Sequence, residues 1–536
     1  MSAPQDQSPS QFPSSDPTSP DPTSPDPTSA AATSVAAVVV LAAGGGTRMK
    51  SSRSKLLHEV GGHSMLSYAV SAATAMQPEH LVVVVGHQRE QVEAHLAEIA
   101  PHVQTAVQSE QRGTGHAVSC GLEGLGELRG EVVVTYADVP LLTADTLSDL
   151  VALHRREQNA VTVLTATAAD PTGYGRVIRS SDGHVTKIVE HRDASPEERD
   201  VAEINSGIYV FDAEVLQHGL TQITPHNAQG ELYLTDVVGV ARSLERQVGA
   251  HLISDGWQTE GVNDRIQLAR INAEMNRRTL EKWMRAGVTV VDPATTWVHS
   301  SVDLSPDVTL LPGTCLEGAT SVAAGAIIGP YTTLTDVEVG ERSTVSRTQA
   351  SLSVIGADAS VGPFAYLRPG TILDAAGKIG TFVETKNAKI GAGAKVPHLA
   401  YAGDAVIGEG ANIGAGTIFA NYDGVTKSTT EVGRYSFVGS DSVLVAPVVI
   451  EDGAYVAAGS TVTGDVAAGQ LAVARGQQRN ISGWVARKRA GTKTAQAAAA
   501  KSGRGGRSDA GDDSPSQASA TVAPADAVTS VEEDQA

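Results

Sequence analysis

The sequence predicts a Rossmann-like α/β domain, then a linker helix, then a left-handed parallel β-helix of hexapeptide repeats, with a disordered tail at each end. Three observations lead to this fold class. Short apolar runs alternate with helical stretches before residue 260, a segment without Gly or Pro follows, and small aliphatic residues then recur at every sixth position. Alternating strands and helices predict a mostly parallel sheet, whereas a period of six is typical of stacked short strands.

The six-residue period is the strongest pattern in the chain. A linker rich in Gly and Ala has no reason to keep such a register, so we expect each aliphatic residue to point into a shared core. The positions that keep the period are Ile355, Val361, Leu367, Ile407, Ile413, Val432, Val438, Leu444, Ile450, Val456 and Val462.

Bulk composition limits the class of protein. A length of 536 residues suggests two or three domains, and a net charge of -20 argues against binding of nucleic acid. Cys120 and Cys315 are too few for a disulfide framework or a metal site, which suits a reducing compartment. No basic residue precedes Arg48, so we expect no secretory signal, and the apolar run at 35–43 is too short to span a membrane. We therefore expect a soluble, cytoplasmic protein without membrane insertion.

Composition also divides the chain. We expect a disordered tail rich in Pro, Ser and Asp at 1–33, an α/β domain at 34–262 and a linker helix at 263–287. The β-helix is expected at 288–486 and a second disordered tail at 487–536. The linker stripe consists of Ile266, Leu268, Ile271, Met275 and Leu280, and Gly287 supplies a stop.

Within the α/β domain, buried strands are predicted at 35–42, 81–85 and 131–136. Helices are predicted between them, for example at 64–76 and 90–99. In such a sheet, ligands bind beyond the carboxyl ends of the strands, so the loops that follow strands are the places to search for a site.

The loop after the first predicted strand contains three consecutive glycines, Gly44 to Gly46, followed by Arg48. Main-chain N–H groups of such a loop can close on a phosphate, and the arginine adds positive charge. The pattern alone is weak, because a simple tight turn explains it equally well. It is not a Walker loop, since no Gly-Lys-Ser/Thr closes it.

The stretch from Leu41 to Met49, with Lys55 as a second cation, resembles the Gly-rich signature of sugar-1-phosphate nucleotidyltransferases. The blocks 108–116, 136–138, 173–176, 203–207 and 261–263, together with Glu190 and the hexads, resemble one bifunctional family. This family is that of the N-acetylglucosamine-1-phosphate uridylyltransferase/glucosamine-1-phosphate N-acetyltransferase enzymes, and the resemblance covers about residues 35 to 486. Gly45, Ala137 and Asp264 depart from its pattern.

The resemblance implies uridylyl transfer from UTP to N-acetylglucosamine 1-phosphate, with release of pyrophosphate. Arg48 and Lys55 offset the charge that accumulates on the phosphates, and Asp138 and Asn263 hold Mg²⁺. The positions implied to bind substrate are Leu41, Ala42, Ala43, Gly44, Lys55, Gln108, Gly113, Thr114, Tyr136, Ala137, Asp138, Gly175, Glu190, Asn205 and Asn263.

A second candidate site lies in the β-helix, where His398 is the only histidine after residue 301. A lone histidine on a β-helix is more often a surface residue than a catalyst. Arg368 and Lys386, however, are cations in a stretch dominated by Gly, Ala and Val, and Asn421 begins a short loop that interrupts the hexads. One histidine cannot supply the several metal ligands of a zinc-dependent carbonic anhydrase of this fold.

The resemblance implies that this half transfers an acetyl group from acetyl-CoA to glucosamine 1-phosphate. Arg368 and Lys386 bind the sugar phosphate, and His398 takes a proton from the attacking amine. Tyr401, Asn412 and Asn421 position the sugar and the carbonyl, while the CoA side is lined by Ala415, Tyr422, Ser440, Ala458 and Arg475. Relatives form homotrimers with sites between subunits, and the same is expected here.

Two alternatives are weighed against this bifunctional enzyme that makes UDP-N-acetylglucosamine. One is a nucleotidyltransferase whose β-helix serves only assembly, which the presence together of Arg368, Lys386 and His398 disfavours. The other is an inactive regulatory subunit, which the retention of Arg48 and Asp138 disfavours.

Overall fold

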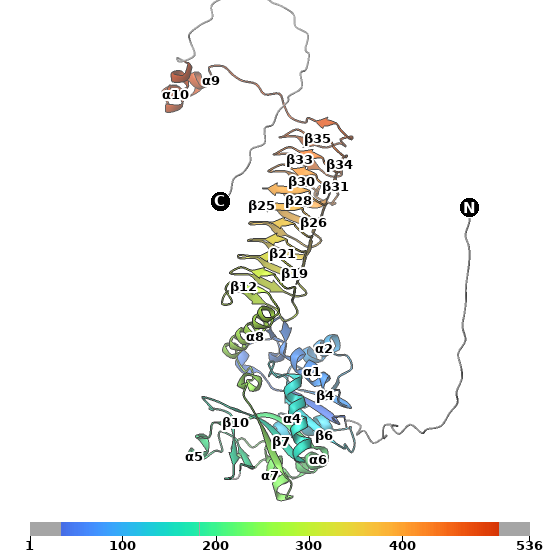
Figure 1. The fold of residues 1–536 in the computed structure, drawn as a ribbon, viewed down its shortest axis with the longest axis vertical. Helices are drawn as coiled ribbons and strands as arrows, with labels where there is room; N and C mark the ends of the chain where they lie inside the picture. The colour runs from blue at the N-terminus through green and yellow to red at the C-terminus, as the bar shows by residue number, and fades with distance from the viewer. Residues whose placement is uncertain (1–33, 182, 503–536) are drawn as a thin grey trace, which may run out of the picture. The chain divides into compact units, whose positions relative to one another are not determined.

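A computed structural model describes residues 34–181 and 183–502. The predicted tail at 1–33, and the predicted C-terminal tail from residue 503 onward, lie outside the described residues. Figure 1 shows an α/β domain and a stack of short strands joined by helix α8. The predicted fold class, an α/β domain followed by a β-helix, is therefore confirmed.

The α/β domain is built on a nine-stranded sheet. Its strands pair in parallel except β10, which runs antiparallel to β6 and β7, and a hairpin of β8 and β9 extends from β10. The main order is β11 (Val248–Ile253), β7 (Val161–Thr167), β10 (Glu203–Asp212), β6 (Glu131–Tyr136), β1 (Ala37–Ala42), β4 (His80–Val85) and β5 (Gln104–Val107), with β8 at Gly175–Arg179 and β9 at Val185–Val189.

Helices cover both faces of this sheet, and the alternation of β1 shows why. Val38 and Val40 pack into one buried cluster, whereas Val39 and Leu41 pack into the cluster on the opposite face. A strand whose side chains are apolar on both faces must be covered on both. One cluster includes residues of α1 (Met65–Ala75), α2 (Arg89–Ile99) and α4 (Ala144–Glu157), and the other includes residues of α3 (Thr114–Leu122), α6 (Ala213–Gln222) and α7 (Asp236–Ser243).

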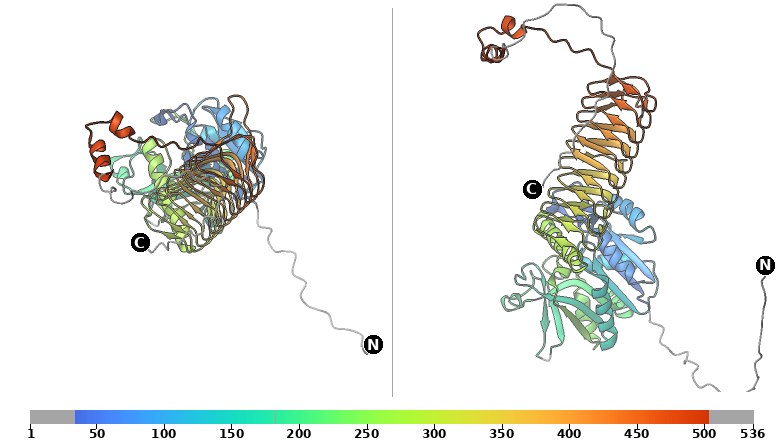
Figure 2. Two further views of the ribbon diagram at one scale, coloured as in Figure 1. Left: turned by 90° about the horizontal axis from the view of Figure 1, so that it is seen from above. Right: turned by 45° about the horizontal axis from the view of Figure 1, so that its top comes forward.

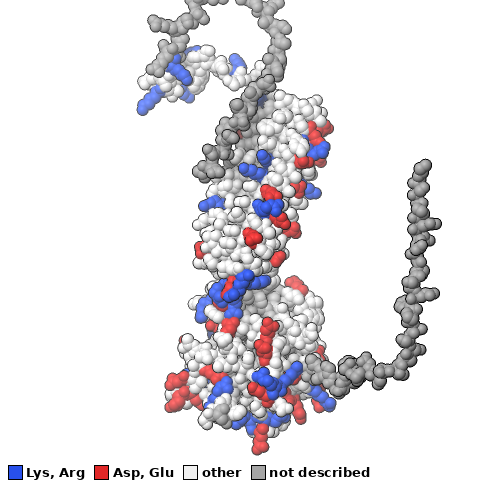
Figure 3. Space-filling model, viewed as in Figure 1, with Lys and Arg blue, Asp and Glu red and all other residues white. Residues whose placement is uncertain are grey.

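Helix α8 (Arg265–Arg285) connects the sheet to the first coil of the β-helix. The Asp264 side chain caps its first turn, and Asn276 donates to the carbonyl of Thr296 and accepts from the N–H of Val298. These two bonds fix the helix to the first coil. Of the predicted apolar stripe, Ile266 is 74% exposed, whereas Ile271 and Leu280 are buried. Figure 3 shows Lys and Arg side chains gathered over α8 with acidic side chains between them. Side chains of both kinds form ion pairs with one another along this helix.

The β-helix has three faces, and its coils stack as Figure 2 shows. All of the aliphatic residues at the predicted six-residue spacing are buried. The first face contains β12 (Thr289–Val290), β15 (Thr309–Leu310), β18 (Ile327–Ile328), β20 (Thr344–Val345), β22 (Ser360–Val361), β25 (Lys378–Thr381), β27 (Lys395–His398), β29 (Asn412–Ile413), β32 (Phe437–Val438), β35 (Tyr455–Val456) and β37 (Leu471–Ala472).

The second and third faces share four long strands that turn a corner between them. These strands are β19 (Thr333–Val339), β21 (Gln349–Ile355), β26 (Glu384–Ile390) and β28 (Tyr401–Ile407). The other strands of the second face are β13 (Trp297–Val298), β16 (Cys315–Glu317), β23 (Tyr366–Leu367), β30 (Ile418–Ala420), β33 (Val443–Val445) and β36 (Thr461–Val462). Those of the third face are β14 (Asp303–Leu304), β17 (Ser321–Val322), β24 (Ile372–Leu373), β31 (Thr430–Val432) and β34 (Val448–Ile450).

One coil is longer than its neighbours. Ile407 is aligned with Val432, 25 positions later, whereas Val432 is aligned with Ile450, 18 positions later. The extra residues form the loop that starts at Asn421, where the sequence predicts an interruption of the hexads. The register of the coils on either side of the loop is kept.

Residues 475–502 belong to a separate unit, whereas the β-helix was expected to reach residue 486 and a structureless tail to begin at residue 487. It contains α9 (Trp484–Lys488) and α10 (Lys493–Ser502), neither of which has a buried residue. The sequence of α10 is rich in Ala, which has the highest helix propensity.

The β-helix core predicts a large stability effect for one aromatic residue. Phe419 is fully buried in β30, so Phe419→Ala leaves a cavity and should lower the free energy of unfolding by about 3–5 kcal/mol. Calorimetry of the full chain measures this effect. Phe364→Ala, at a position 52% exposed, is the matched control and should cost much less. Equal losses for the two variants would contradict this account of the core.

Candidate functional site

The Gly-rich loop follows directly from the carboxyl end of β1. It leads into a short 3₁₀ helix, η1 (Thr47–Met49), which contains Arg48, and then into η2 (Lys55–Leu57), which begins with Lys55. Gly44 is exposed, and no atom approaches the position that a side chain on it would occupy. The loop therefore leaves room for a ligand between the end of β1 and the two cations.

A close ion pair lies beside this loop. Lys55 Nζ is 2.5 Å from Asp138 Oδ2, and the two side chains are only 10% and 19% exposed. Asp138 follows β6, which is the neighbour of β1 in the sheet, so the two parallel strands bring the residues together. The sequence separation of 83 residues is thus closed by the strand order.

The loop before α3 supplies a second wall. Gly113 has a φ of 106°, and a Cβ on it would lie 2.5 Å from the carbonyl oxygen of Leu232, so no other residue fits there. Gln108 donates to the carbonyl of Gly113 at 3.1 Å, and the hydroxyl of Thr114 accepts from the N–H of Leu234. These bonds order the loop as the first turn of α3 begins.

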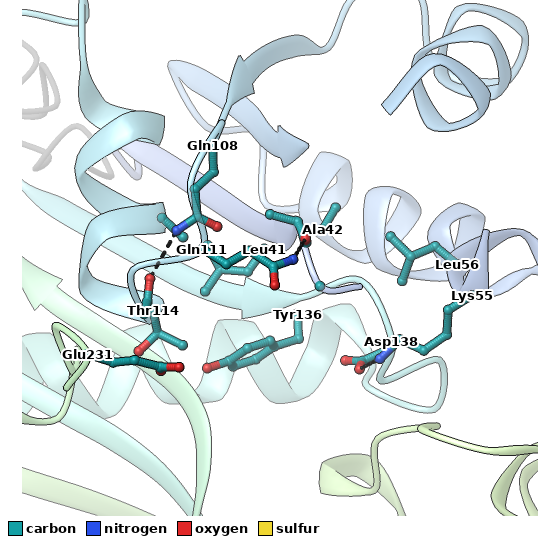
Figure 4. Close-up of a pocket in the computed structure, with 14 residues that line it drawn as sticks. Leu41, Ala42, Lys55, Leu56, Gln108, Gln111, Thr114, Tyr136, Asp138 and Glu231 are labelled. Carbon is teal, nitrogen blue, oxygen red and sulfur yellow. Dashed lines mark hydrogen bonds and ion pairs between the residues drawn. The ribbon is translucent and has the colours of Figure 1, made fainter. Parts of the chain in front are cut away.

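Figure 4 shows that these elements enclose one pocket. Of its lining residues, Leu56, Gln111, Ala117 and Glu231 were not among the predicted site residues. Gln111 lies within the predicted loop and donates to the carbonyl of Ala43 at 2.8 Å, a contact that the motif itself could have suggested. Glu231 comes from a distant loop without a motif. The predicted residues in the lining are Leu41, Ala42, Ala43, Gly44, Lys55, Gln108, Gly113, Thr114, Tyr136 and Asp138.

The predicted sugar positions come together near Tyr136. Asn205 is aligned with Gly175 in the β8–β10 pair, and Glu190 follows β9, the partner of β8. Asn205 accepts a hydrogen bond from the hydroxyl of Tyr209 at 2.8 Å. Burial raises the pKa of Glu190, and nearby carboxylates raise it further. Burial also raises the pKa of Tyr136, with contributions from Asp138 and Glu190, so its phenol stays protonated near neutral pH.

The donor set for a divalent cation is small. Asn263 Oδ1 accepts from Arg48 at 2.9 Å, and the N–H of Val262 donates to the carbonyl of Asp138, which brings Asn263 near Asp138. Within the described residues, no group of three or more His, Cys, Asp or Glu could hold a metal. One carboxylate and one amide oxygen nevertheless suit Mg²⁺, which keeps water and substrate phosphates as its other ligands.

In the β-helix, the predicted residues lie at two corners that flank the second face. At one corner, Lys386 Nζ is 3.6 Å from Asp404 Oδ1, and Asn421 Nδ2 donates to Asp404 Oδ2 at 2.5 Å. Arg368 pairs with Glu384 at 3.0 Å. Asp404 and Glu384 were missed from sequence, because acidic residues give no signal for a phosphate site.

Lys427 was missed as well. The close approach and positive charge of Lys386 lower the pKa of Lys427, Asp404 counteracts this effect, and Arg368 adds to it. Three cations are therefore near one another at this corner. Lys427 lies in the inserted loop, whose position only the tertiary structure reveals.

His398 lies at the other corner, at the end of β27, with its side chain exposed. Its carbonyl accepts from Gly416, and the carbonyls of Ala415 and Ser440 accept from Asp441 and Gly459 in the next coils. The predicted CoA-side residues Ala415, Ser440 and Ala458 therefore form a line along the prism above His398.

Tyr401 lies on the face between the two corners. A Cβ atom on Gly403 would overlap the hydroxyl of Tyr401. Only glycine at position 403 therefore allows the Tyr401 ring to lie toward the corner that contains Lys386. The remaining predicted residues are dispersed: Asn412 is in β29 on the first face, Tyr422 is exposed in the inserted loop, and Arg475 begins the separate segment 475–502.

Across residues 34–181 and 183–502, none of the helices combines the length and the apolar character needed to traverse a bilayer.

Known proteins resemble both halves of this chain. A nucleotidyl transferase family model matches residues 37–266. The chain is 57% identical over 466 residues to the Bifunctional protein GlmU of Pseudarthrobacter chlorophenolicus, covering 86% of this chain and 95% of the relative. It is 56% identical over 463 residues to that of Streptomyces avermitilis and 54% identical over 467 residues to that of Corynebacterium efficiens, each covering 86% of this chain and 96% of the relative. With this similarity over most of its length, the chain belongs to the GlmU family of bifunctional proteins.

Proposed function

We propose that this chain makes UDP-N-acetylglucosamine in two reactions, acetyl transfer on the β-helix and uridylyl transfer on the α/β domain. The observation that carries the proposal is the pocket at the carboxyl ends of β1 and β6, where Lys55 and Asp138 meet a Gly-rich loop. Family membership and the second cluster of cations on the β-helix support the two-reaction form.

In the uridylyl transfer, a phosphate oxygen of N-acetylglucosamine 1-phosphate attacks the α-phosphorus of UTP, and pyrophosphate leaves. Two anions must approach each other, so positioning and neutralisation of charge supply most of the rate. Lys55 and Arg48 offset the negative charge, and the loop with Gln108, Gly113 and Thr114 receives the uracil base.

Asp138 and Asn263 would hold Mg²⁺, which would supply positive charge to offset that of the reacting phosphates. Asp138 Oδ2 accepts from Lys55, and Asn263 Oδ1 accepts from Arg48. Release of these cations toward the phosphates would leave both oxygens available to a metal. Glu190 and Asn205 hold the sugar near Tyr136.

In the acetyl transfer, the amine of glucosamine 1-phosphate attacks the thioester carbonyl of acetyl-CoA, and the C–S bond breaks to release CoA. Arg368 and Lys386 bind the sugar phosphate at one corner of the prism, and CoA lies along the other corner beyond His398. Tyr401, between the corners, contacts the sugar. His398 takes the proton that the amine loses.

Because these groups lie on an exposed face, we further propose that the active form is a homotrimer whose neighbouring subunits close the acetyl site. A cytoplasmic location likewise remains a proposal.

His398→Ala separates the two reactions. Loss of the proton acceptor should lower CoA release from acetyl-CoA and glucosamine 1-phosphate by about 10²–10⁴-fold. Pyrophosphate release from UTP and N-acetylglucosamine 1-phosphate should be unchanged, because His398 lies outside the α/β domain. If the wild-type chain releases no CoA, the β-helix serves only assembly and the two-reaction proposal fails.

Lys55→Ala is the opposite test. Removal of a cation from the phosphate site should lower pyrophosphate release by about 10²–10³-fold and leave CoA release intact. Arg53→Ala is the control, since Arg53 is an exposed cation two residues away that pairs with Glu59. A similar loss in both variants would contradict a specific role for Lys55.

Asp138→Asn tests the metal site. With a neutral amide in place of the carboxylate, the Mg²⁺ concentration for half-maximal pyrophosphate release should rise at least about tenfold. A chelator should stop pyrophosphate release and spare CoA release. An unchanged Mg²⁺ dependence would place the metal elsewhere.

A further inference from the structure

Asp404 lies between two asparagine side chains, one from each neighbouring coil of the β-helix. Asn387, Asp404 and Asn421 are 17 positions apart and occupy equivalent corner positions in successive coils. Asn387 Nδ2 donates to Asp404 Oδ1 at 2.9 Å, and Asn421 Nδ2 donates to Asp404 Oδ2 at 2.5 Å. Each carboxylate oxygen therefore binds an amide from one neighbouring coil.

This arrangement decides the orientation of the Asn421 amide. An ionised carboxylate only accepts hydrogen bonds, so the Asn421 nitrogen must face Asp404, and its carbonyl oxygen must point the other way. Asn421 itself is buried, with 8% exposure, which leaves its side chain few other positions. Its oxygen is thereby presented as a hydrogen-bond acceptor.

The charge of Asp404 also fits this role. Its side chain is 11% exposed and lies 3.6 Å from the ammonium group of Lys386. Burial works to raise the pKa of Asp404, but the bonds from Asn387 and Asn421 and the charge of Lys386 bring it below its ordinary value. Asp404 is therefore ionised near neutral pH and offsets part of the repulsion among the cations at this corner.

We propose that Asp404 is a positioning residue for acetyl transfer: it holds the Asn421 carbonyl oxygen toward the substrate amine. There the oxygen accepts an N–H of the amine and directs the nitrogen lone pair to the thioester. The proposal rests on the proposed acetyl-transfer function. Asp404 itself does not contact the substrate in this arrangement.

The test is Asp404→Asn, which keeps the size of the side chain but supplies a donor as well as an acceptor. The side-chain amide of Asn421 can then rotate by 180°, which exchanges the positions of its oxygen and nitrogen. This misorientation should lower kcat for CoA release by about 10- to 100-fold. KM for glucosamine 1-phosphate should not rise, because Arg368 and Lys386 remain and the variant removes a negative charge beside Lys386. Pyrophosphate release and thermal stability report whether the chain is folded.

Asp358→Asn is the matched control, because Asp358 is an exposed carboxylate at a different corner of the same prism that pairs with Arg342. It should leave kcat and KM for acetyl transfer unchanged. If Asp404→Asn disrupts the fold, Asp404→Glu, which keeps the charge but shifts the carboxylate, is measured in the same way and should also lower kcat.

A double-variant cycle tests whether Asp404 acts through Asn421. If it does, Asp404→Asn combined with Asn421→Ala should be no slower than Asn421→Ala alone. An unchanged kcat in Asp404→Asn, a loss confined to KM, or losses that multiply in the double variant would each overturn the proposal. Absence of CoA release from the wild-type chain would instead overturn the proposed function on which it rests.

Discussion

Parallel pairing with a fixed register is the constraint on which both candidate sites depend. In the sheet, β1 and β6 run side by side and end together, so the Gly-rich loop and Asp138 meet although they are distant in sequence. In the β-helix, successive coils keep register through buried aliphatic side chains, even where one coil carries an inserted loop. A residue at a corner therefore lies above its equivalent in the previous coil, and polar residues that the sequence separates form continuous lines.

Paired charges are the second shared feature. Lys55 with Asp138 and Lys386 with Asp404 each place a cation beside a carboxylate in a partly enclosed position. Cations that lie close together repel one another, and a neighbouring carboxylate lowers that cost. Both halves of the chain therefore place a carboxylate beside a cation, although their folds are unrelated.

Much of the fold was predictable because its signals are local and periodic. The strands at β1, β4 and β6, the linker helix and the buried hexads are confirmed, since burial on both sheet faces and one inward residue in six leave direct patterns in the sequence. Family membership confirms the predicted bifunctional enzyme with a nucleotidyltransferase domain. The two helices within 484–502 were not expected, because they bury nothing and leave no apolar pattern.

The sequence by itself determined the order of the domains, the period of the β-helix and the motifs that carry most of the candidate site residues. Only the tertiary structure decided which side chains meet. It placed Gln111 and Glu231 in the lining of the pocket beside the Gly-rich loop, Lys427 beside Lys386, and Asp404 between two amides from neighbouring coils. These contacts join residues from separate strands, loops and coils. Which residues meet depends on the order of the strands and on the register of the coils. The sequence around a single acidic or amide residue contains no pattern that records either.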